Sequence, residues 1–250
     1  MRKSKLVAII SEQRGRDYME DRHSFEQNFT HKGWIFGGVY DGHGMEKPAE
    51  TAVKRIPEIL KEISRGLTAD EAFQEAYKTA SEEMAPWAFY GGTCAANFLI
   101  RDKTVYHANV GDCRIVVVGK KVVELTTDHR LENRVEMRRV KKAGGEIVYR
   151  HKHAYVYNGE RCLMPTRTLG DQGFKSKGVI STPSTGQYHI KPSDRFLVAA
   201  TDGLFDVVTN EEVLKISREA KTPARLADWL THQVILNEGQ DNLTIMVVKL

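Results

Sequence analysis

Acidic residues recur at the ends of apolar segments, where they could build a site for a metal ion. Asp41 follows the apolar run 34–40 and begins the motif DGHG, and Asp202 with Gly203 follows the apolar run 196–201 in the same way. Four more acids border predicted strands: Glu20, Asp21, Asp112 and Asp241. Because Asp and Gly favour turns generally, any one Asp-Gly pair is explained by turn preference. The recurrence of such acids along the chain calls for a further explanation.

Carboxylates gathered at one end of packed sheets repel one another unless protons or cations neutralise them. A bound divalent cation is the simplest neutralising partner. Oxygen ligands without a cysteine cluster suit Mg²⁺ or Mn²⁺ rather than zinc. Gly42, directly after Asp41, has no side chain to shield its carbonyl from an approaching ion. The pattern therefore predicts a centre for a hard divalent cation.

The composition is that of a globular protein and gives little support to a nucleic-acid or membrane partner. Hydrophobic residues make up 41% of the 250, enough for a sizeable core, and the net charge is only +4. The 37 basic and 33 acidic residues are well mixed, and the basic run 134–142 is typical of the solvated face of a helix. We therefore expect neither nucleic acid nor membrane as a partner.

The cysteines and the N-terminus favour a cytoplasmic location. The 3 cysteines are odd in number and far apart, which argues against a disulfide framework and against a cysteine-rich zinc site. The basic N-terminus carries only a short apolar run, too short for a signal-peptide core, and we interpret Lys5–Ile10 as a first strand. No apolar stretch approaches the roughly 20 residues needed to span a bilayer.

The predicted elements come in blocks of strands and blocks of helices. Further strands are predicted at 34–40, 93–100, 104–110, 114–118, 121–125, 146–149, 196–200 and 243–248. Two helices are predicted between residues 40 and 92, the second after a capping box at Thr68, and three more at 132–142, 210–218 and 223–236. Residues 150–190 are less regular and are expected to form a surface excursion. This order predicts one α+β domain, 1–250, with two packed, mostly antiparallel sheets and helices outside.

The motifs resemble, in order and spacing, those of the metal-dependent protein phosphatases of type 2C. They are RDYMED at 16–21, DGHG at 41–44, GT at 92–93, GDCR at 111–114, DH at 128–129, RTLGD at 167–171, DGLFD at 202–206 and DN at 241–242. The DGHG motif alone would be a weak match, whereas so many motifs in order are specific. The resemblance implies a four-layer α-β-β-α sandwich with a flap segment, about 149–177, that influences substrate choice.

The resemblance also implies a binuclear Mg²⁺ or Mn²⁺ centre and a phosphatase acting on phosphoserine and phosphothreonine in signalling proteins. In-line attack by a water or hydroxide that bridges the two ions would need no covalent phosphoenzyme. Asp41 would bridge the ions, the Gly42 carbonyl and Glu20 would hold one, and Asp202 and Asp241 the other. Positions that would support these ligands or hold a weaker third ion are Asp21, Asp112, Asp206 and Asn242.

Three further residues have roles implied by the resemblance. Arg16 would offer a bidentate fork to phosphate, and Arg167 is a second substrate-binding candidate. His43 would protonate the departing serine or threonine oxygen, since imidazole titrates near neutral pH. Two of these residues could instead have a purely structural role. Arg16 could form an ion pair with Asp17 or Glu20, and His43 could simply pack beside the acids.

Other functions stay open at this point. The runner-up is a catalytically silent pseudophosphatase that acts as a binding protein, although every expected acid is present. A two-metal phosphodiesterase or nuclease is a third reading, disfavoured by the modest charge. Cys94 and Cys113 are predicted to be small core residues, and His151 and His153 an exposed pair rather than a metal site. The active phosphatase, acting as a monomer on phosphoproteins, is the leading hypothesis.

Overall fold

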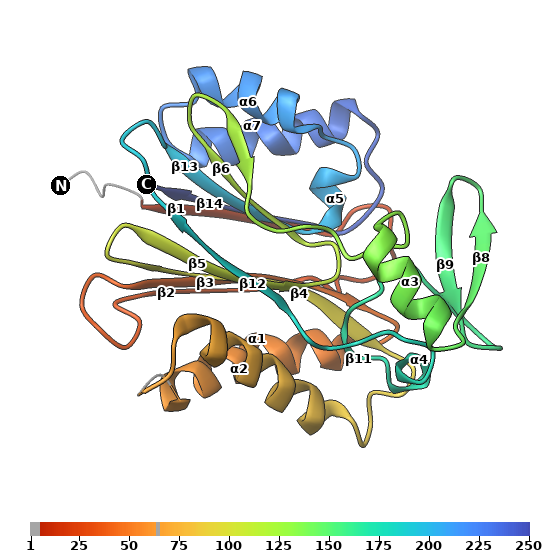
Figure 1. Ribbon diagram of the computed structural model, residues 1–250. Coiled ribbons are helices and arrows are strands. Elements are labelled where there is room, and N and C mark those ends of the chain that lie inside the picture. The colour runs from red at the N-terminus through yellow and green to blue at the C-terminus, as the bar shows by residue number, and fades with distance from the viewer. Residues whose placement is uncertain (1–5, 64–65) are drawn as a thin grey trace.

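The computed structural model describes residues 6–63 and 66–250, which form two antiparallel sheets packed face to face between layers of helices (Figure 1). The first sheet has the order β1 (Val7–Glu12), β14 (Leu243–Lys249), β13 (Phe196–Ala200), β6 (Arg114–Val118), β7 (Val122–Glu124). The second has the order β12 (Ser184–His189), β5 (Thr104–Val110), β4 (Gly92–Arg101), β3 (Ile35–His43), β2 (Arg22–Gln27). A short strand, β11 (Leu169–Gly170), pairs with the start of β4.

Helices cover the outer face of each sheet. α1 (Glu46–Ile63) and α2 (Ala69–Met84) pack on the second sheet, and α6 (Asn210–Glu219) and α7 (Pro223–Leu236) pack on the first. The predicted caps are present: Thr68 and Glu71 form the capping box of α2, and Thr222 caps α7 ahead of Pro223. The predicted four-layer α-β-β-α sandwich is thereby confirmed.

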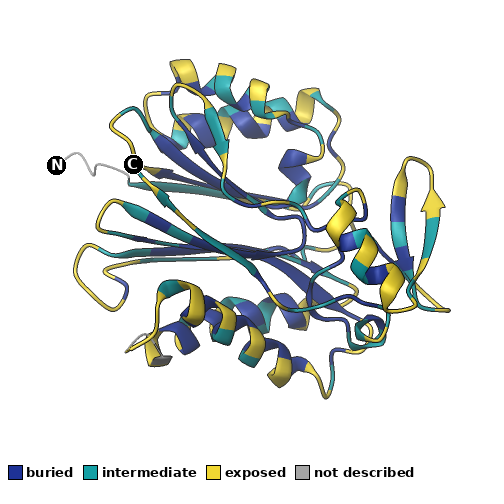
Figure 2. Ribbon diagram, in the orientation of Figure 1, coloured by how far each residue is buried: buried dark blue, intermediate teal, exposed yellow. Residues whose placement is uncertain are grey.

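Alternation along the strands decides which side chains face the helices and which face the other sheet. In β3, Phe36 and Tyr40 pack against the helices, whereas Val39 packs between the sheets. Figure 2 shows the same division, with buried residues along the strands and exposed residues on the outer sides of the helices. Asp41 lies two residues after Val39, so it shares the inner face of β3 at the end of the strand.

A lobe lies beyond one end of the sheets (Figure 1). It contains α3 (Arg134–Lys142), the small sheet β10 (Cys162–Leu163), β9 (His153–Tyr157), β8 (Glu146–Arg150), and α4 (Gln172–Lys175). Its core includes Val140, Val156 and Phe174. The predicted helix 132–142 is present from Arg134, and Gly144, with a φ of +74°, follows its end as expected.

Several predicted bounds need correction. The predicted first strand is observed as Val7–Glu12, and Lys5 lies outside the described residues. The segment 150–190 is more regular than expected, because it holds β9, β10, β11 and β12. β12 has the polar sequence STGQYH and lies at the edge of its sheet, so backbone pairing with β5 rather than apolar periodicity defines it. A short helix, α5 (Asp202–Phe205), follows β13 and is too short to give a helical period.

Two other sequence expectations concern exposure. Cys94 and Cys113 are buried, and His151 and His153 are exposed in the β8–β9 hairpin, as predicted. Within residues 6–63 and 66–250, no helix has the length and apolar character needed to cross a membrane.

Candidate metal centre

Three carboxylates converge where the two sheets end. Oxygens of Asp41, Asp112 and Asp202 all lie within 4.8 Å of one another. Asp41 comes from the end of β3 and Asp112 from the turn between β5 and β6, while Asp202 begins α5 directly after β13. Both sheets therefore contribute, and residues 161 positions apart in the sequence meet because their strands end at the same edge. The structure brings these three acids together as the sequence predicted.

The cluster lies at the bottom of a cavity of about 880 Å³ between the ends of the sheets and the lobe. Glu20, Gly42 and Asp241 line the same cavity. The Glu20 Oε1 atom is buried and has no hydrogen-bond partner among the residues that the structure describes. An unpaired buried carboxylate oxygen is costly, and a cation beside it would remove that cost. This set of oxygen atoms fits a hard divalent ion.

Burial and mutual repulsion make the charged state of these acids unfavourable. Burial, together with the charges of neighbouring acids, raises the pKa of Asp41 and of Asp202 well above its ordinary value. Burial also raises the pKa of Glu20, and it raises the pKa of Asp21 to about 7. The raised pKa values of Asp41 and Asp202 favour their neutral, protonated forms when no positive charge lies beside them. A divalent cation would replace those protons.

We expect Mn²⁺ binding to release protons, because Asp41 and Asp202, whose pKa values are raised, must ionise to act as ligands. Affinity should accordingly increase as the pH rises. Titration calorimetry in two buffers with different ionisation enthalpies measures the proton count directly. Equal apparent heats in the two buffers, together with an affinity that does not change with pH, would contradict this expectation.

Gly42 allows β3 to pass close to the segment that carries Glu20. A Cβ atom at this position would lie 2.7 Å from the Glu20 carbonyl oxygen and 3.1 Å from the Ala49 Cβ atom of α1. Any other residue would push β3 away from one of these neighbours. The glycine therefore holds two predicted ligand positions, 20 and 41, on adjacent segments.

Two buried polar residues fix the segments that carry the acids. The Asn242 amide holds the loop before β2, since its Oδ1 accepts from Glu20 N at 2.8 Å and its Nδ2 donates to Tyr18 O at 3.2 Å. The Asp21 carboxylate accepts a hydrogen bond of 2.8 Å from the hydroxyl of Thr201, the residue before Asp202. Asn242 therefore positions Glu20 through the backbone N–H of Glu20. Asp21 positions Asp202 through its neighbour Thr201.

His43 lines the cavity and is paired with a buried acid. Its Nε2–H donates to Asp171 Oδ2 at 2.7 Å, and the Asp171 side chain is only 2% exposed. Although burial alone would lower it, the charge and hydrogen bond of Asp171 raise the pKa of His43 above its ordinary value. The Asp171 carboxylate therefore favours the protonated form of the imidazole.

The His43–Asp171 pair depends on backbone features that the sequence did not disclose. Asp171 adopts a left-handed conformation with a φ of +50°. A Cβ atom on Gly92 would lie 2.0 Å from Asp171 Oδ2, so only glycine leaves room for this carboxylate. Asp171 belongs to the RTLGD motif identified in the sequence, but the sequence gave it no role. The motif could therefore point to Asp171, whereas its pairing with His43 could be recognised only in the folded structure.

Arg16 forms an ion pair with Asp241 rather than with Asp17 or Glu20. Its Nε–H donates to Asp241 Oδ1 at 2.8 Å, and its Nη2 pairs with Asp241 Oδ2. The Arg16 side chain is 58% exposed, so it can leave this pair without unpacking a core. Arg16 lines the cavity, as do Arg150 and Arg161, and its exposed guanidinium is available to an anion that enters.

The structure does not bring Arg167, the second substrate-binding candidate, to the cavity that the acids line. Its Nη2 pairs at 2.7 Å with Glu136, a carboxylate that is only 1% exposed, and its Nη1 donates to Thr182 O. A carboxylate so deeply buried requires a paired cation, and Arg167 is fixed in that position. The RTLGD motif contributes Asp171 to the site instead.

Arg130 is a site neighbour to which the sequence assigned no role. It lies in the connection between β7 and α3 and forms ion pairs with Asp112 at 2.6 Å, Asp206 at 2.8 Å and Asp202 at 3.4 Å. Asp206, predicted to hold a weaker third ion, is thus bound to a guanidinium. Arg130 is distant in sequence from Asp202 and Asp206 and shares no motif with them, so its ion pairs could be recognised only in the folded structure.

Comparison with known proteins places these features in a family. The family model for protein phosphatase 2C matches residues 6–243. A probable protein phosphatase 2C 2 of Arabidopsis thaliana is 34% identical over 94% of this chain and 64% of its own length. Protein phosphatase 1L of Bos taurus is 33% identical over 99% of this chain and 73% of its own length.

Solved structures share the fold. The serine-threonine phosphatase 2C from Toxoplasma gondii superposes with a TM-score of 0.85, with 23% identity over 97% of this chain and 94% of the other. At this identity the likeness concerns the arrangement of the layers. The chain spans 64% of the length of the Arabidopsis relative.

Proposed function

Since this chain belongs to the protein phosphatase 2C family of metal-dependent protein serine/threonine phosphatases, we propose that its acid cluster holds two Mg²⁺ or Mn²⁺ ions for hydrolysis of phosphoserine and phosphothreonine. The observation that carries this proposal is the convergence of Asp41, Asp112 and Asp202 at the bottom of the cavity. Burial and neighbouring acids raise the pKa values of Asp41 and Asp202, and a cation would relieve that repulsion. A pseudophosphatase is not favoured, because each predicted ligand acid lines the cavity.

The proposed ligands are the residues that the sequence motifs suggested as ligands, and all of them line the cavity. Asp41, whose carboxylate lies on the inner face of β3 beside Asp202, would contribute to holding both ions. Glu20, with its unpaired Oε1, and the Gly42 carbonyl would hold one ion, and Asp202 and Asp241 would hold the other. When bound, a pair of divalent ions supplies a hydroxide nucleophile near neutral pH and offsets charge on the phosphate.

Arg16 has the proposed role of binding the phosphate. A cation bound at Asp241 would compete with the Arg16 guanidinium for the same two oxygens. The released guanidinium is planar and can donate two parallel hydrogen bonds to non-reacting phosphate oxygens, which a lysine cannot do. Its exposed side chain allows this exchange of partners.

His43 has the proposed role of protonating the departing serine or threonine oxygen. Asp171 orients the ring through Nε2 and favours the charged imidazolium. The ring is 29% exposed and faces the cavity, where a substrate oxygen could approach it. Because an alkoxide is a poor leaving group, a proton donor at this point lowers the barrier.

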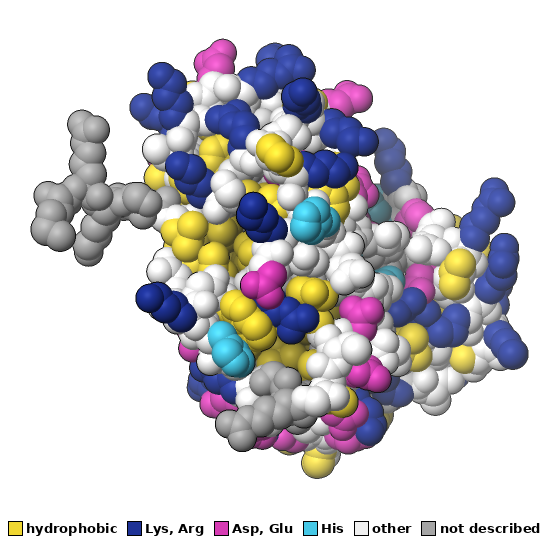
Figure 3. All heavy atoms as spheres, turned by 60° about the vertical axis from the view of Figure 1, so that its left-hand side comes forward, with side chains coloured by type: hydrophobic (Ala, Val, Ile, Leu, Met, Phe, Trp, Pro, Cys, Tyr) yellow, Lys and Arg dark blue, Asp and Glu magenta, His cyan; other side chains and the backbone are white. Residues whose placement is uncertain are grey.

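We propose that residues 1–250 form a single domain and that the protein is a cytoplasmic monomer acting on phosphoproteins. Within this domain, the segment 149–177 is the proposed flap and contributes Tyr155 and Arg161 to the cavity wall. On the face seen in Figure 3, Lys and Arg side chains are spread widely with Asp and Glu among them, which does not favour a nucleic-acid partner. The 3 cysteines, all within the described residues, are free thiols, which suits a reducing compartment.

Phosphate release from a phosphothreonine peptide tests the proposed function. We expect release that depends on added Mn²⁺ or Mg²⁺, stops with a chelator and returns when the metal is restored. Single-stranded DNA should remain intact under the same conditions. Absence of phosphate release with either metal would overturn the proposal, and faster cleavage of DNA than of the peptide would favour a phosphodiesterase.

A further inference from the structure

We propose that Arg130 is a built-in cation that takes the place of a third metal ion at Asp112, Asp202 and Asp206, so that this chain binds two divalent ions and not three. The inference rests on the proposed two-ion centre and goes beyond it, because it assigns a function to a residue outside the predicted ligand set. It also reverses the expectation that Asp112 and Asp206 hold a weaker third ion.

The geometry of Arg130 carries the proposal. Its Nε–H donates to Asp112 Oδ2 at 2.6 Å, and its Nη2 lies 2.8 Å from Asp206 Oδ1 and 3.4 Å from Asp202 Oδ2. One guanidinium therefore contacts all three carboxylates. A planar fork with fixed donor directions can bridge acids in this way, whereas an ammonium group is a single point of charge.

Both oxygens of Asp112, the most buried of the three acids, are already engaged. Asp112 is only 3% exposed, and its other oxygen, Oδ1, accepts a hydrogen bond of 3.1 Å from the Cys94 thiol. A cation entering here would have to displace both partners of Asp112 and lie beside the charge of Arg130. Arginine stays charged at every accessible pH, so this repulsion cannot be relieved by loss of a proton.

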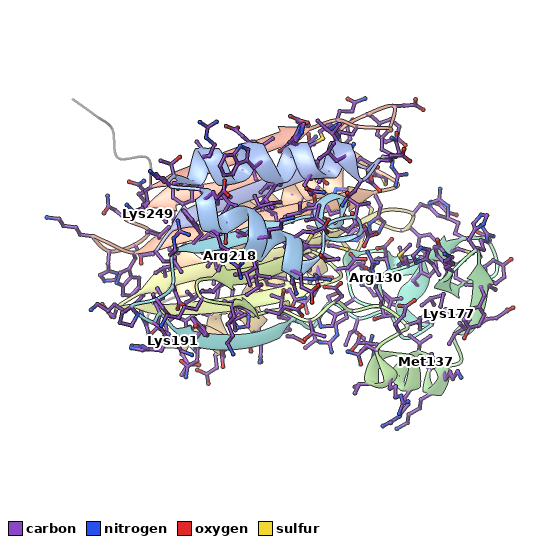
Figure 4. The ribbon with its side chains drawn as sticks, turned by 90° about the horizontal axis from the view of Figure 1, so that it is seen from above. Arg130, Met137, Lys177, Lys191, Arg218 and Lys249 are labelled. Atoms are coloured by element: carbon purple, nitrogen blue, oxygen red, sulfur yellow. The ribbon has the colours of Figure 1, made fainter. Side chains whose placement is uncertain are left out.

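Arg130 is held in place by its surroundings. Its side chain is 14% exposed, and its carbonyl accepts a hydrogen bond from the N–H of Asn133, the N-cap of α3. Arg130 lies where the sandwich meets the lobe that carries Met137 and Lys177 (Figure 4). It is therefore a positioning residue that links the lobe to Asp202, one of the proposed ligands.

Counting bound Mn²⁺ by equilibrium dialysis tests the inference. We expect the wild-type chain to saturate at two ions and Arg130→Met, which keeps much of the side-chain length but removes the charge, to bind a third, weaker ion. Adding Asp206→Asn to Arg130→Met should remove that third ion. Saturation of the wild type at three ions, or an Arg130→Met chain that folds and still saturates at two, would overturn the inference.

A second variant keeps the test decisive if Arg130→Met fails to fold, as judged by circular dichroism. Asp206→Asn in the wild-type chain should leave the number of bound ions at two, because Asp206 pairs with Arg130 and not with a metal. A loss of one ion from this variant would overturn the inference. A wild-type chain that binds no ion would instead overturn the proposed metal centre itself, and with it any role for Arg130 toward that centre.

Discussion

Replacement of Asp41 by asparagine is expected to lower kcat/KM for a phosphothreonine peptide by about 10³-fold or more, since a lost bridging ligand removes several kcal/mol of charge stabilisation. The amide keeps the shape of the side chain but offers only one neutral oxygen. It would therefore leave the ions with unscreened mutual repulsion. Steady-state phosphate release, measured at a saturating Mn²⁺ concentration for the wild type, gives the comparison.

The matched control is Asp228→Asn, which makes the same chemical change on the exposed face of α7. It should keep wild-type turnover. Mn²⁺ titration of Asp41→Asn should show weakened binding, and its melting temperature in chelator should not fall, because the variant removes a buried acid from a repulsive cluster. An Asp41→Asn variant that retains both full metal binding and turnover would contradict the bridging assignment.

Replacement of His43 by alanine is expected to lower kcat for the phosphothreonine peptide by about 10²-fold or more, the usual contribution of a general acid. The effect on p-nitrophenyl phosphate should be much smaller, because p-nitrophenolate leaves as a stable anion and needs no proton. The ratio of the two rates therefore isolates proton donation from any general damage to the site. Parallel assays of both substrates at one pH measure it.

Metal binding by His43→Ala should stay close to that of the wild type, because the imidazole pairs with Asp171 and not with the acid cluster. His232→Ala, on the exposed side of α7, is the control for loss of a histidine ring and should change neither rate. Equal losses on both phosphate substrates would show that His43 does not act as a proton donor. Loss of Mn²⁺ binding would assign it to the metal centre instead.

Much of the fold could be predicted because its signals are local. Continuous apolar runs marked strands such as Phe196–Ala200, and the capping box at Thr68 marked the start of α2. The edge strand Ser184–His189 escaped prediction, because a half-exposed strand without an apolar stripe depends on its neighbour for definition. The bounds of the first strand also differed, since the pairing of β1 with β14 rather than composition decides where it begins.

Sequence patterns predicted only those site residues that stand in a recognisable local context, such as an aspartate at the end of a strand. Aspartates at strand ends could be identified one by one, and the fold joined Asp41, Asp112 and Asp202. The arginines could not be assigned in this way. Arg167 and Arg130 have the same side chain, yet one neutralises a buried glutamate in the lobe and the other bridges three acids of the centre. Their partners are distant in sequence, so only tertiary packing separates the two roles.

Anomalous diffraction from crystals grown with Mn²⁺ would locate the bound ions. We expect two anomalous peaks, about 3.5–4 Å apart, with the Asp41 carboxylate between them and Arg16 turned away from Asp241. Glu20 and the Gly42 carbonyl should contact one peak, and Asp202 should contact the other. A single peak, or a pair of peaks away from Asp41, would contradict the proposed metal centre.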